Sequence, residues 1–323
     1  MAVLASAAMA DLHLRTVTRA QGNNRALIDG TVTPEGAAFD FEEVPVLVQG
    51  FRRMVRDLEF DVCEMALTTY LVARAHGVRF TAVPAFLVRG FHHGAITVDT
   101  RHGISQPKDL EGRKVGVNRG YTVTTGVWAR SVLADEHCVD LDSITWMLSG
   151  DEHVAAYRPP ANVVPVDAGR TLDEMLASGE LSAVVGVEID SPDARPLLPD
   201  PQAAAYAALR RGLWPINHLV VIRDELLEQH PDLGRRVFDA FAESKRRYVQ
   251  QLRAGTLPQE TATDRMHRTV METTGWDDPL PYGIEPNRTV LEELLRTAVD
   301  QKILDRAPRL EDIFTADTRD VVG

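Results

Sequence analysis

Histidine and carboxylate side chains in this sequence gather where apolar, strand-like stretches begin or end. The pair His92-His93 comes just before one such stretch, and the run Ser149-Gly-Asp-Glu-His153 directly follows another. Neighbouring carboxyl and imidazole groups can be tuned to different pKa values and can then transfer protons. Each histidine of the pair is interpreted as a general acid, as a hydrogen-bond partner of a ligand, or as a structural residue.

A metal site is a further alternative for the same histidines. His93 would need additional ligands such as His102, His153 or Glu152, and their spacing matches no recurrent metal signature. The two cysteines of the chain supply neither metal-site spacing nor a disulfide framework. We therefore expect no metal, with a divalent ion at these histidines as the alternative.

Three arginines are candidate anchors for an acidic ligand. A guanidinium group makes two parallel hydrogen bonds to a carboxylate, which suits Arg25, Arg74 and Arg89 to that task. The alternative for each of the three is a surface salt bridge.

Hydroxyl and aromatic side chains mark two more strand ends. One apolar stretch runs into Thr68, and another, 115–117, runs into a turn that ends at Tyr121. Free backbone N–H groups at such strand-to-helix turns bind anions. If the two ends face each other, they could hold an anionic ring compound. The alternative is a purely structural role, in which the threonines only cap helices. The candidate ligand-binding residues at these ends are Thr68, Thr69, Tyr70, Tyr121, Thr122, Thr124 and Thr125.

Two later segments carry further candidates. His218 precedes a buried strand and is interpreted either as a hinge hydrogen-bond partner or as a cleft residue. Tyr282 and Glu285 lie in a turn-rich motif, 281–288, and a cleft role for one of them competes with a surface role. Asp151 and Glu152 are candidates from the acidic run described first.

The overall charge limits the classes of partner. The formal net charge is −12, and there is no long Lys/Arg run, so a nucleic-acid or anionic-membrane partner is not expected. Positive potential for an anionic ligand must then be concentrated locally. The N-terminal stretch lacks a basic region and no apolar run reaches membrane-spanning length, so we expect a cytoplasmic protein.

Apolar stretches alternate with helical patterns along most of the chain. Strands are expected at 12–17, 38–46, 60–67, 80–86 and 95–98, and the pattern restarts with 114–117, 144–148 and 183–187 before a last strand at 218–222. A chain of 323 residues exceeds one compact core. The prediction is an α/β protein of two lobes, 1–98 plus 213–323 and 99–212, each a mostly parallel sheet flanked by helices, with a ligand cleft between them.

Five stretches resemble the 4,5-dihydroxyphthalate decarboxylase family, which has a type II periplasmic-binding-protein-like fold put to enzymatic use. The resemblance spans about 14–314. Its stretches are Arg25-Ala-Leu-Ile-Asp-Gly30, Glu59-Phe-Asp-Val-Cys-Glu-Met65, Tyr70-Leu-Val-Ala-Arg74, Trp214-Pro-Ile-Asn-His218 with Val220-Val-Ile-Arg223, and Pro281-Tyr-Gly-Ile-Glu-Pro-Asn-Arg288.

The resemblance implies loss of CO2 from a hydroxylated aromatic acid without an organic cofactor, with 4,5-dihydroxyphthalate giving protocatechuate as the first expectation. It makes Arg25, Arg74 and Arg89 the anchors and His92 or His93 the proton donor. Glu64, His153 or His218 would orient a ring hydroxyl.

Two other functions stay open. A solute-binding protein or sensor for an aromatic acid needs the same cleft but no poised proton donor. The other alternative is a decarboxylase or isomerase of a non-phthalate acid. The expected partner in each case is a small anionic molecule. The sequence leaves the oligomeric state open, a homo-oligomer included.

Overall fold

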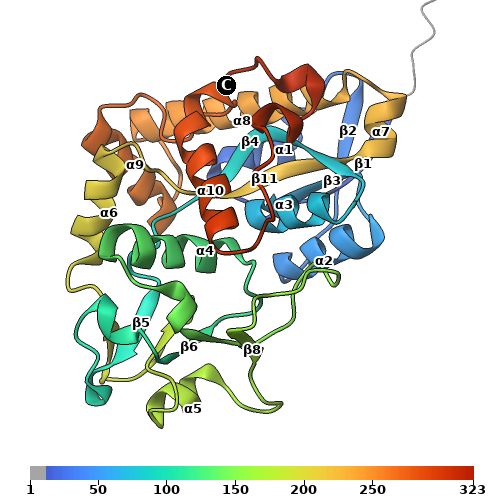
Figure 1. The fold of residues 1–323 in the computed structure, drawn as a ribbon. Helices are drawn as coiled ribbons and strands as arrows, with labels where there is room; N and C mark the ends of the chain where they lie inside the picture. The colour runs from blue at the N-terminus through green and yellow to red at the C-terminus, as the bar shows by residue number, and fades with distance from the viewer. Residues whose placement is uncertain (1–11) are drawn as a thin grey trace, which may run out of the picture.

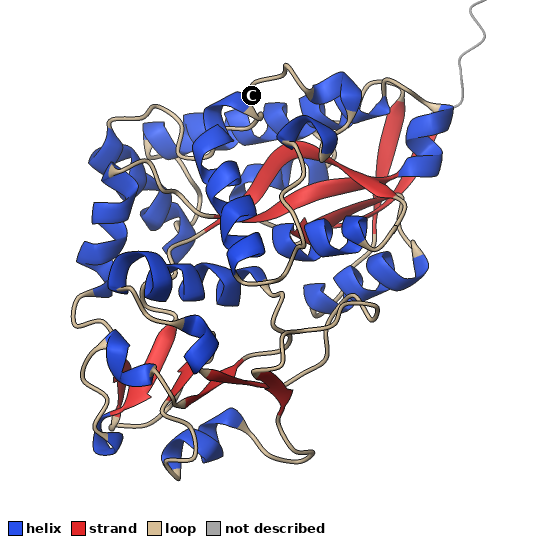
Figure 2. Ribbon diagram, viewed as in Figure 1, coloured by secondary structure: helices blue, strands red, loops and turns tan. Residues whose placement is uncertain are grey.

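The computed structural model describes residues 12–323, in which two β-sheets are flanked by helices (Figures 1 and 2). The expectation that the N-terminal stretch is not a signal peptide falls mostly on residues 1–11, outside the described part. Within 12–323, no helix is long and apolar enough to cross a membrane.

The first sheet has the strand order β2-β1-β3-β11-β4. Strand β1 pairs in parallel with β2 and β3, while β11 runs antiparallel between β3 and β4. Its strands are β1 (Leu12–Val17), β2 (Ala37–Phe41), β3 (Val62–Ala66), β4 (Phe80–Arg89) and β11 (Ile216–Arg223).

The second sheet has the order β10-β5-β9-β6-β7-β8 and is antiparallel only around β5. Its strands are β5 (Ile96–Asp99), β6 (Lys114–Val117), β7 (Thr145–Leu148), β8 (Val163–Pro165), β9 (Ala183–Val185) and β10 (Ala194–Pro196). We call the first sheet with its helices lobe one and the second sheet with its helices lobe two. The antiparallel strands β5 and β11 are the ones that follow each crossing between the lobes.

The helices cover both sheets. They are α1 (Arg25–Ile28), α2 (Leu47–Asp57), α3 (Leu67–Ala75), α4 (Thr124–Ser131), α5 (Leu172–Ala177), α6 (Pro201–Arg210), α7 (Asp224–Gln229), α8 (Leu233–Ala254), α9 (Ala262–Thr274) and α10 (Arg288–Asp300). Figure 1 shows α4 lying between the second sheet and the helices α3 and α10 of lobe one. The Trp128 indole donates to the carbonyl of Ile216 (3.0 Å), which ties α4 to the start of β11.

The crossing from lobe one differs from the expected boundary. The stretch 95–98 was assigned to lobe one, but β5 pairs with β9 and β10 in the second sheet. The chain therefore leaves lobe one between Arg89 and Ile96. The sequence of a four-residue apolar strand does not indicate which sheet the strand will join, because side chains alternate between the two faces in the same way in every sheet.

Helix α6 forms just after a segment rich in proline. Pro201 sits in the first turn of the helix, where its missing N–H costs no hydrogen bond, and the Asp200 carboxylate accepts from the N–H of Ala203 (2.8 Å). Pro201 therefore starts this helix and does not interrupt it.

Both ends of the chain build lobe one. The N–H of Thr315 donates to the carbonyl of Ala82 on β4 (2.9 Å), and Gly283 forms a bridge with Val322.

All residues of β3 are buried, and its one charged residue, Glu64, is 1% exposed. A buried charged side chain needs hydrogen-bond or ion-pair partners. Glu64 therefore marks β3 as a candidate for the functional site.

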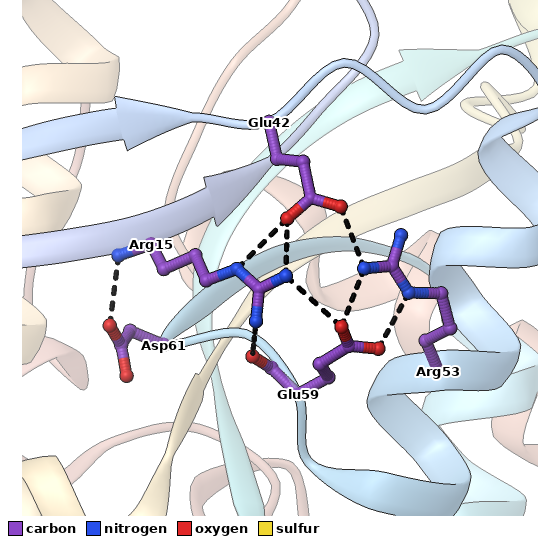
Figure 3. Close-up of polar contacts among 5 residues, drawn as sticks. All are labelled: Arg15, Glu42, Arg53, Glu59 and Asp61. Carbon is purple, nitrogen blue, oxygen red and sulfur yellow. Dashed lines mark hydrogen bonds and ion pairs between the residues drawn. The ribbon is translucent and has the colours of Figure 1, made fainter.

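A dense ion-pair cluster joins β1, α2 and the segment before β3 (Figure 3). Arg53 of α2 contacts Glu42 and Glu59, both at 2.6 Å, and Arg15 contacts Glu42 at 2.5 Å and Glu59 at 3.0 Å. Both guanidinium groups lie over the Phe60 ring. Hydrogen bonds from Arg53 and then Arg15 lower the pKa of Glu42, and those from Arg53 lower the pKa of Glu59 to about 2.

Candidate active site

Glu64 and His218 form a buried carboxylate–imidazole pair on adjacent strands. His218 Nδ1 lies 2.6 Å from Glu64 Oε1, and the other carboxylate oxygen accepts from Thr18 Oγ1 (2.7 Å) and the N–H of Arg19 (3.0 Å). Burial raises the pKa of Glu64, but the bonds from His218, Thr18 and Arg19 outweigh it and hold that pKa below its ordinary value. The ionised carboxylate fixes the imidazole with Nδ1–H donating.

The second nitrogen of His218, Nε2, makes no hydrogen bond to any residue from 12 to 323. The side chain is part-exposed, at 18%. A carboxylate-oriented imidazole with one free nitrogen is the arrangement that accepts and returns a proton in many enzymes.

His153 of lobe two lies close to this pair. Its Nδ1 is 3.1 Å from Thr69 Oγ1, and the Phe51 ring meets both imidazoles edge-on, with centroids 6.3 Å from His153 and 5.2 Å from His218. His153 is 3% exposed, and its buried Nε2 has no hydrogen-bond partner in the described part of the chain. Burial, reinforced by the charges of Arg52 and Arg119, lowers the pKa of His153 to about 4, so the ring is neutral at pH 7.

The two predicted strand ends meet. Thr68 Oγ1 donates to the carbonyl of Thr122 (2.6 Å) and lies 2.8 Å from Thr124 Oγ1. Thr68 and Thr69 begin α3 after β3, while Thr124 and the half-buried Thr125 begin α4 after β6. The structure therefore brings the ends of β3 and β6 into direct contact across the lobes.

The backbone donors of the β6–α4 turn already hold an anion. The N–H groups of Tyr121 (2.5 Å) and Thr122 (3.3 Å) and the Thr122 hydroxyl (2.6 Å) all donate to the Glu152 carboxylate. A Cβ at Gly120 would lie 2.6 Å from Glu152 Oε2, so a side chain there would displace the Glu152 carboxylate. The expectation that Tyr121 and Thr122 bind the ligand through these groups is corrected, because an internal carboxylate occupies them.

The three predicted arginine anchors lie elsewhere. Arg89 is buried and donates to the carbonyls of Trp214 (2.9 Å) and Pro281 (3.1 Å) and to Asn287, and burial lowers its pKa to about 9. Arg74 lies at the C-terminal end of α3, opposite the end that carries Thr68, and Arg25 is exposed at the start of α1. The length of α3 sets the position of Arg74, and backbone carbonyls already accept from Arg89. Residue spacing along the sequence reveals neither fact.

Two other arginines, both exposed, have their backbones fixed at the ends of β1 and β6. The N–H of Arg19 donates to Glu64 after β1, and the N–H of Arg119 donates to Ser149 Oγ (2.8 Å) after β6. Arg119 adopts a left-handed φ of 68°. Neither guanidinium group forms an ion pair or hydrogen bond within residues 12–323, although both backbones are pinned.

His92 and His93 form a separate group. His92 Nε2 lies 3.1 Å from Asn217 Oδ1, and His93 Nε2 lies 3.2 Å from Glu136 Oε1. Both line a pocket of about 320 Å³ together with Trp128. The lining of this pocket does not include Glu64, His153 or His218, and burial lowers the pKa of His92 to about 4. The structure does not place the expected proton donors with the other site residues.

The remaining candidates have hydrogen-bond or ion-pair partners of their own. The Tyr70 hydroxyl donates to the carbonyl of Ile313, and Glu285 is an exposed partner of Arg288. Buried Tyr282 accepts from Asn23 Nδ2 (3.4 Å). Asp151 pairs with two arginines of α2. In the described ranges, no three His, Cys, Asp or Glu side chains come together as a metal site.

Sequence reasoning missed several residues beside the site: Thr18, Arg19, Phe51, Arg52, Arg56 and Arg119. Thr18 and Arg19 follow a strand, so the strand-end rule that found Thr68 could also have found them. Phe51 carried no signal, because an apolar residue at helical spacing reads as core.

Two proteins of known name are similar to this chain over most of its length. The 4,5-dihydroxyphthalate decarboxylase of Comamonas testosteroni is 33% identical over 312 residues, covering 89% of this chain and 91% of the relative. That of Pseudomonas putida is 35% identical over 207 residues, 57% of this chain and 78% of the relative. No protein-family model matches the sequence.

Solved structures share the fold. The periplasmic aliphatic sulphonate binding protein SsuA from Escherichia coli superposes with a TM-score of 0.53 at 11% identity, covering 95% of this chain and 99% of that one. A putative sulfonate-binding SsuA from Methylobacillus flagellatus gives 0.51 at 12% identity, covering 95% and 92%. The two-lobed periplasmic-binding-protein-like fold expected from the sequence is confirmed.

Proposed function

The chain belongs to the 4,5-dihydroxyphthalate decarboxylase family, and from that premise we propose that it converts 4,5-dihydroxyphthalate to protocatechuate and CO2. The substrate is a small aromatic dianion. Its position between two lobes follows the general rule that ligands of such sheets bind beyond the carboxyl ends of the strands. The protein is a carboxy-lyase.

The reaction needs a proton and a path for electrons. A ring hydroxyl para to the departing carboxylate pushes electron density to the carbon that carries it, and that carbon takes up a proton. The bond to the carboxylate then breaks, CO2 leaves, and the electron pair of that bond restores the aromatic ring. One proton is consumed for each CO2 released, and no oxidant, reductant or organic cofactor enters the balance.

His218 is the proposed proton-transfer group, and Glu64 positions it. The observation that carries this assignment is the 2.6 Å contact between His218 Nδ1 and the buried, ionised Glu64, which leaves Nε2 available. Nε2 accepts the proton of the para hydroxyl as the ring electrons shift and delivers a proton to the ring carbon. In this proposal His218, positioned by Glu64, is the proton donor that the sequence analysis expected at His92 or His93.

The anchors are Arg19 and Arg119, one from the end of β1 in lobe one and one from the end of β6 in lobe two. Their guanidinium groups are unpaired within 12–323 while their backbones are fixed, which suits bidentate contacts to the two carboxylates. His153 Nε2, buried and unpartnered, supplies a hydrogen bond to the ring substituents.

The test is to mix purified protein with 4,5-dihydroxyphthalate and to follow protocatechuate by chromatography and CO2 by a coupled assay. We expect stoichiometric formation of both. Tight binding without turnover would contradict the proposal and favour the receptor function. His218→Asn is expected to bind the substrate while losing most of the turnover.

A further inference from the structure

Two arginines of α2 hold the segment of lobe two that carries His153. Arg52 Nη2 lies 2.5 Å from Asp151 Oδ1, and Arg56 Nη2 lies 2.9 Å from Asp151 Oδ2. Arg56 also donates to the carbonyls of Glu152 (3.1 Å) and His153 (3.4 Å). Because α2 belongs to lobe one and 151–153 follows β7 of lobe two, each of these bonds crosses between the lobes. We call Arg52, Arg56 and Asp151 the interlobe clasp.

The clasp ends at a side chain that the proposed reaction needs. Arg56 holds the His153 backbone, Thr69 holds its Nδ1, and Phe51 of α2 packs against its ring. The direction of the unpartnered Nε2 is therefore set by lobe one, although His153 belongs to lobe two. Opening of the lobes would break all three contacts at once.

The rest of the site does not depend on these contacts. Glu64, His218 and Thr18 lie on β3, on β11 and just after β1, all in lobe one, and His218 and Thr18 both contact Glu64 directly. Loss of the clasp therefore changes where His153 stands without changing the proposed proton-transfer pair.

We propose that Arg52, Arg56 and Asp151 are positioning residues that set the affinity for substrate by closing lobe two onto lobe one and placing His153 against the bound ring. The identity of that ring rests on the proposed function. Single exposed ion pairs are weak, but here two guanidinium groups share one carboxylate and together donate to three carbonyls, those of Asp151, Glu152 and His153. When only part of the population is closed, the apparent affinity falls by that fraction.

The experiment replaces Asp151 with asparagine, which keeps the shape and removes the charge. We expect KM and the calorimetric Kd for 4,5-dihydroxyphthalate to rise about 3- to 10-fold while kcat changes less than about twofold. Asp151→Glu should restore affinity to within about twofold of the wild type. Arg52→Gln/Arg56→Gln should match Asp151→Asn, and combining all three changes should add little, because they remove the same contacts.

The matched control is Glu42→Gln, which weakens the ion pair of Arg53 on the same helix but within lobe one. It should leave KM and Kd unchanged. An unchanged Kd in Asp151→Asn, an equal loss in Glu42→Gln, or failure of Asp151→Glu to restore affinity overturns the proposal.

Two further measurements separate this inference from the proposed function. Binding of 4,5-dihydroxyphthalate without turnover would end the proposed function, and the Kd comparison would still decide on the clasp. Small-angle X-ray scattering without ligand gives a readout that requires no substrate. Asp151→Asn should have a larger radius of gyration than the wild type, and equal radii would overturn the closing role.

Discussion

Helix α2 carries two sets of ion pairs that differ in what they join. Arg53 binds Glu42 and Glu59 in a cluster that lies wholly within lobe one, and each carboxylate there has two guanidinium partners (Figure 3). Arg52 and Arg56 instead reach Asp151 of lobe two, beside an imidazole whose Nε2 has no partner in residues 12–323. The comparison teaches that charges saturated among themselves serve the scaffold, whereas unsatisfied polar atoms mark where a ligand belongs.

The largest expected effect is a loss of kcat on replacing His218 in the candidate active site. Replacing His218 with alanine removes the proposed proton-transfer group and should lower kcat about 10²- to 10⁴-fold, the usual range for general acid–base catalysis. Steady-state kinetics with 4,5-dihydroxyphthalate provides the measurement. Glu59→Gln, in the cluster of Figure 3, is the control and should leave kcat unchanged. Comparable losses in both variants would erase the functional distinction between the two regions.

Glu64→Gln should come next in size. The amide cannot accept as strongly from His218 Nδ1–H, so the imidazole loses its fixed orientation, and kcat should fall about 10- to 1,000-fold with a smaller change in KM. Steady-state kinetics with 4,5-dihydroxyphthalate provides the measurement, and Glu64→Asp, which keeps the carboxylate, should recover part of the rate. A full rate in Glu64→Gln would show that the carboxylate only fills the core.

As the pH falls, the site and the ion-pair cluster should lose their contributions to folding stability in different pH ranges. The folded pKa of His153 is about 4 against an ordinary 6.5, so the unfolded chain takes up the proton first and stability is lost as pH falls from 6.5 to 4. The loss amounts to at most about 1.4 kcal/mol per pH unit. Glu59, with a pKa of about 2 against 4.5, contributes stability that is lost only below pH 4.5.

Melting temperatures measured from pH 7 to pH 3 check this order. His153→Asn should flatten the decline above pH 4.5, and Glu59→Gln should flatten the decline below it. Identical curves for the two variants would refute the assignment.

The smallest expected effect comes from metal removal. The proposed proton transfer uses only side chains and a ring hydroxyl, so dialysis against EDTA should leave kcat/KM unchanged within the error of the assay. Lost activity that a divalent ion restores would revive the metal alternative considered for His93.

Sequence reasoning found most of the strands and two strand ends that meet, but it missed β8 and β10 and did not find the pairing of Glu64 with His218. The apolar run of β3 and the hydroxyls after it were recognisable because burial and helix capping leave local signatures, and Thr68 does contact the β6–α4 turn. Glu64 and His218 are neighbours only because β11 returns beside β3, and spacing along the chain does not encode that pairing. The predicted anchors Arg74 and Arg89 have other partners, because Arg74 contacts Asp224 and Arg89 donates to backbone carbonyls.

The discontinuous first sheet has a consequence for biosynthesis. Strand β11, which completes the sheet between β3 and β4, is translated only after the whole of lobe two, and the contacts of Thr315 and Val322 come later still. The second sheet can therefore assemble on the ribosome first, while β3 and β4 wait with apolar edges exposed. Nascent chains truncated before Ile216 should recruit chaperones to the N-terminal strands rather than to the inserted lobe.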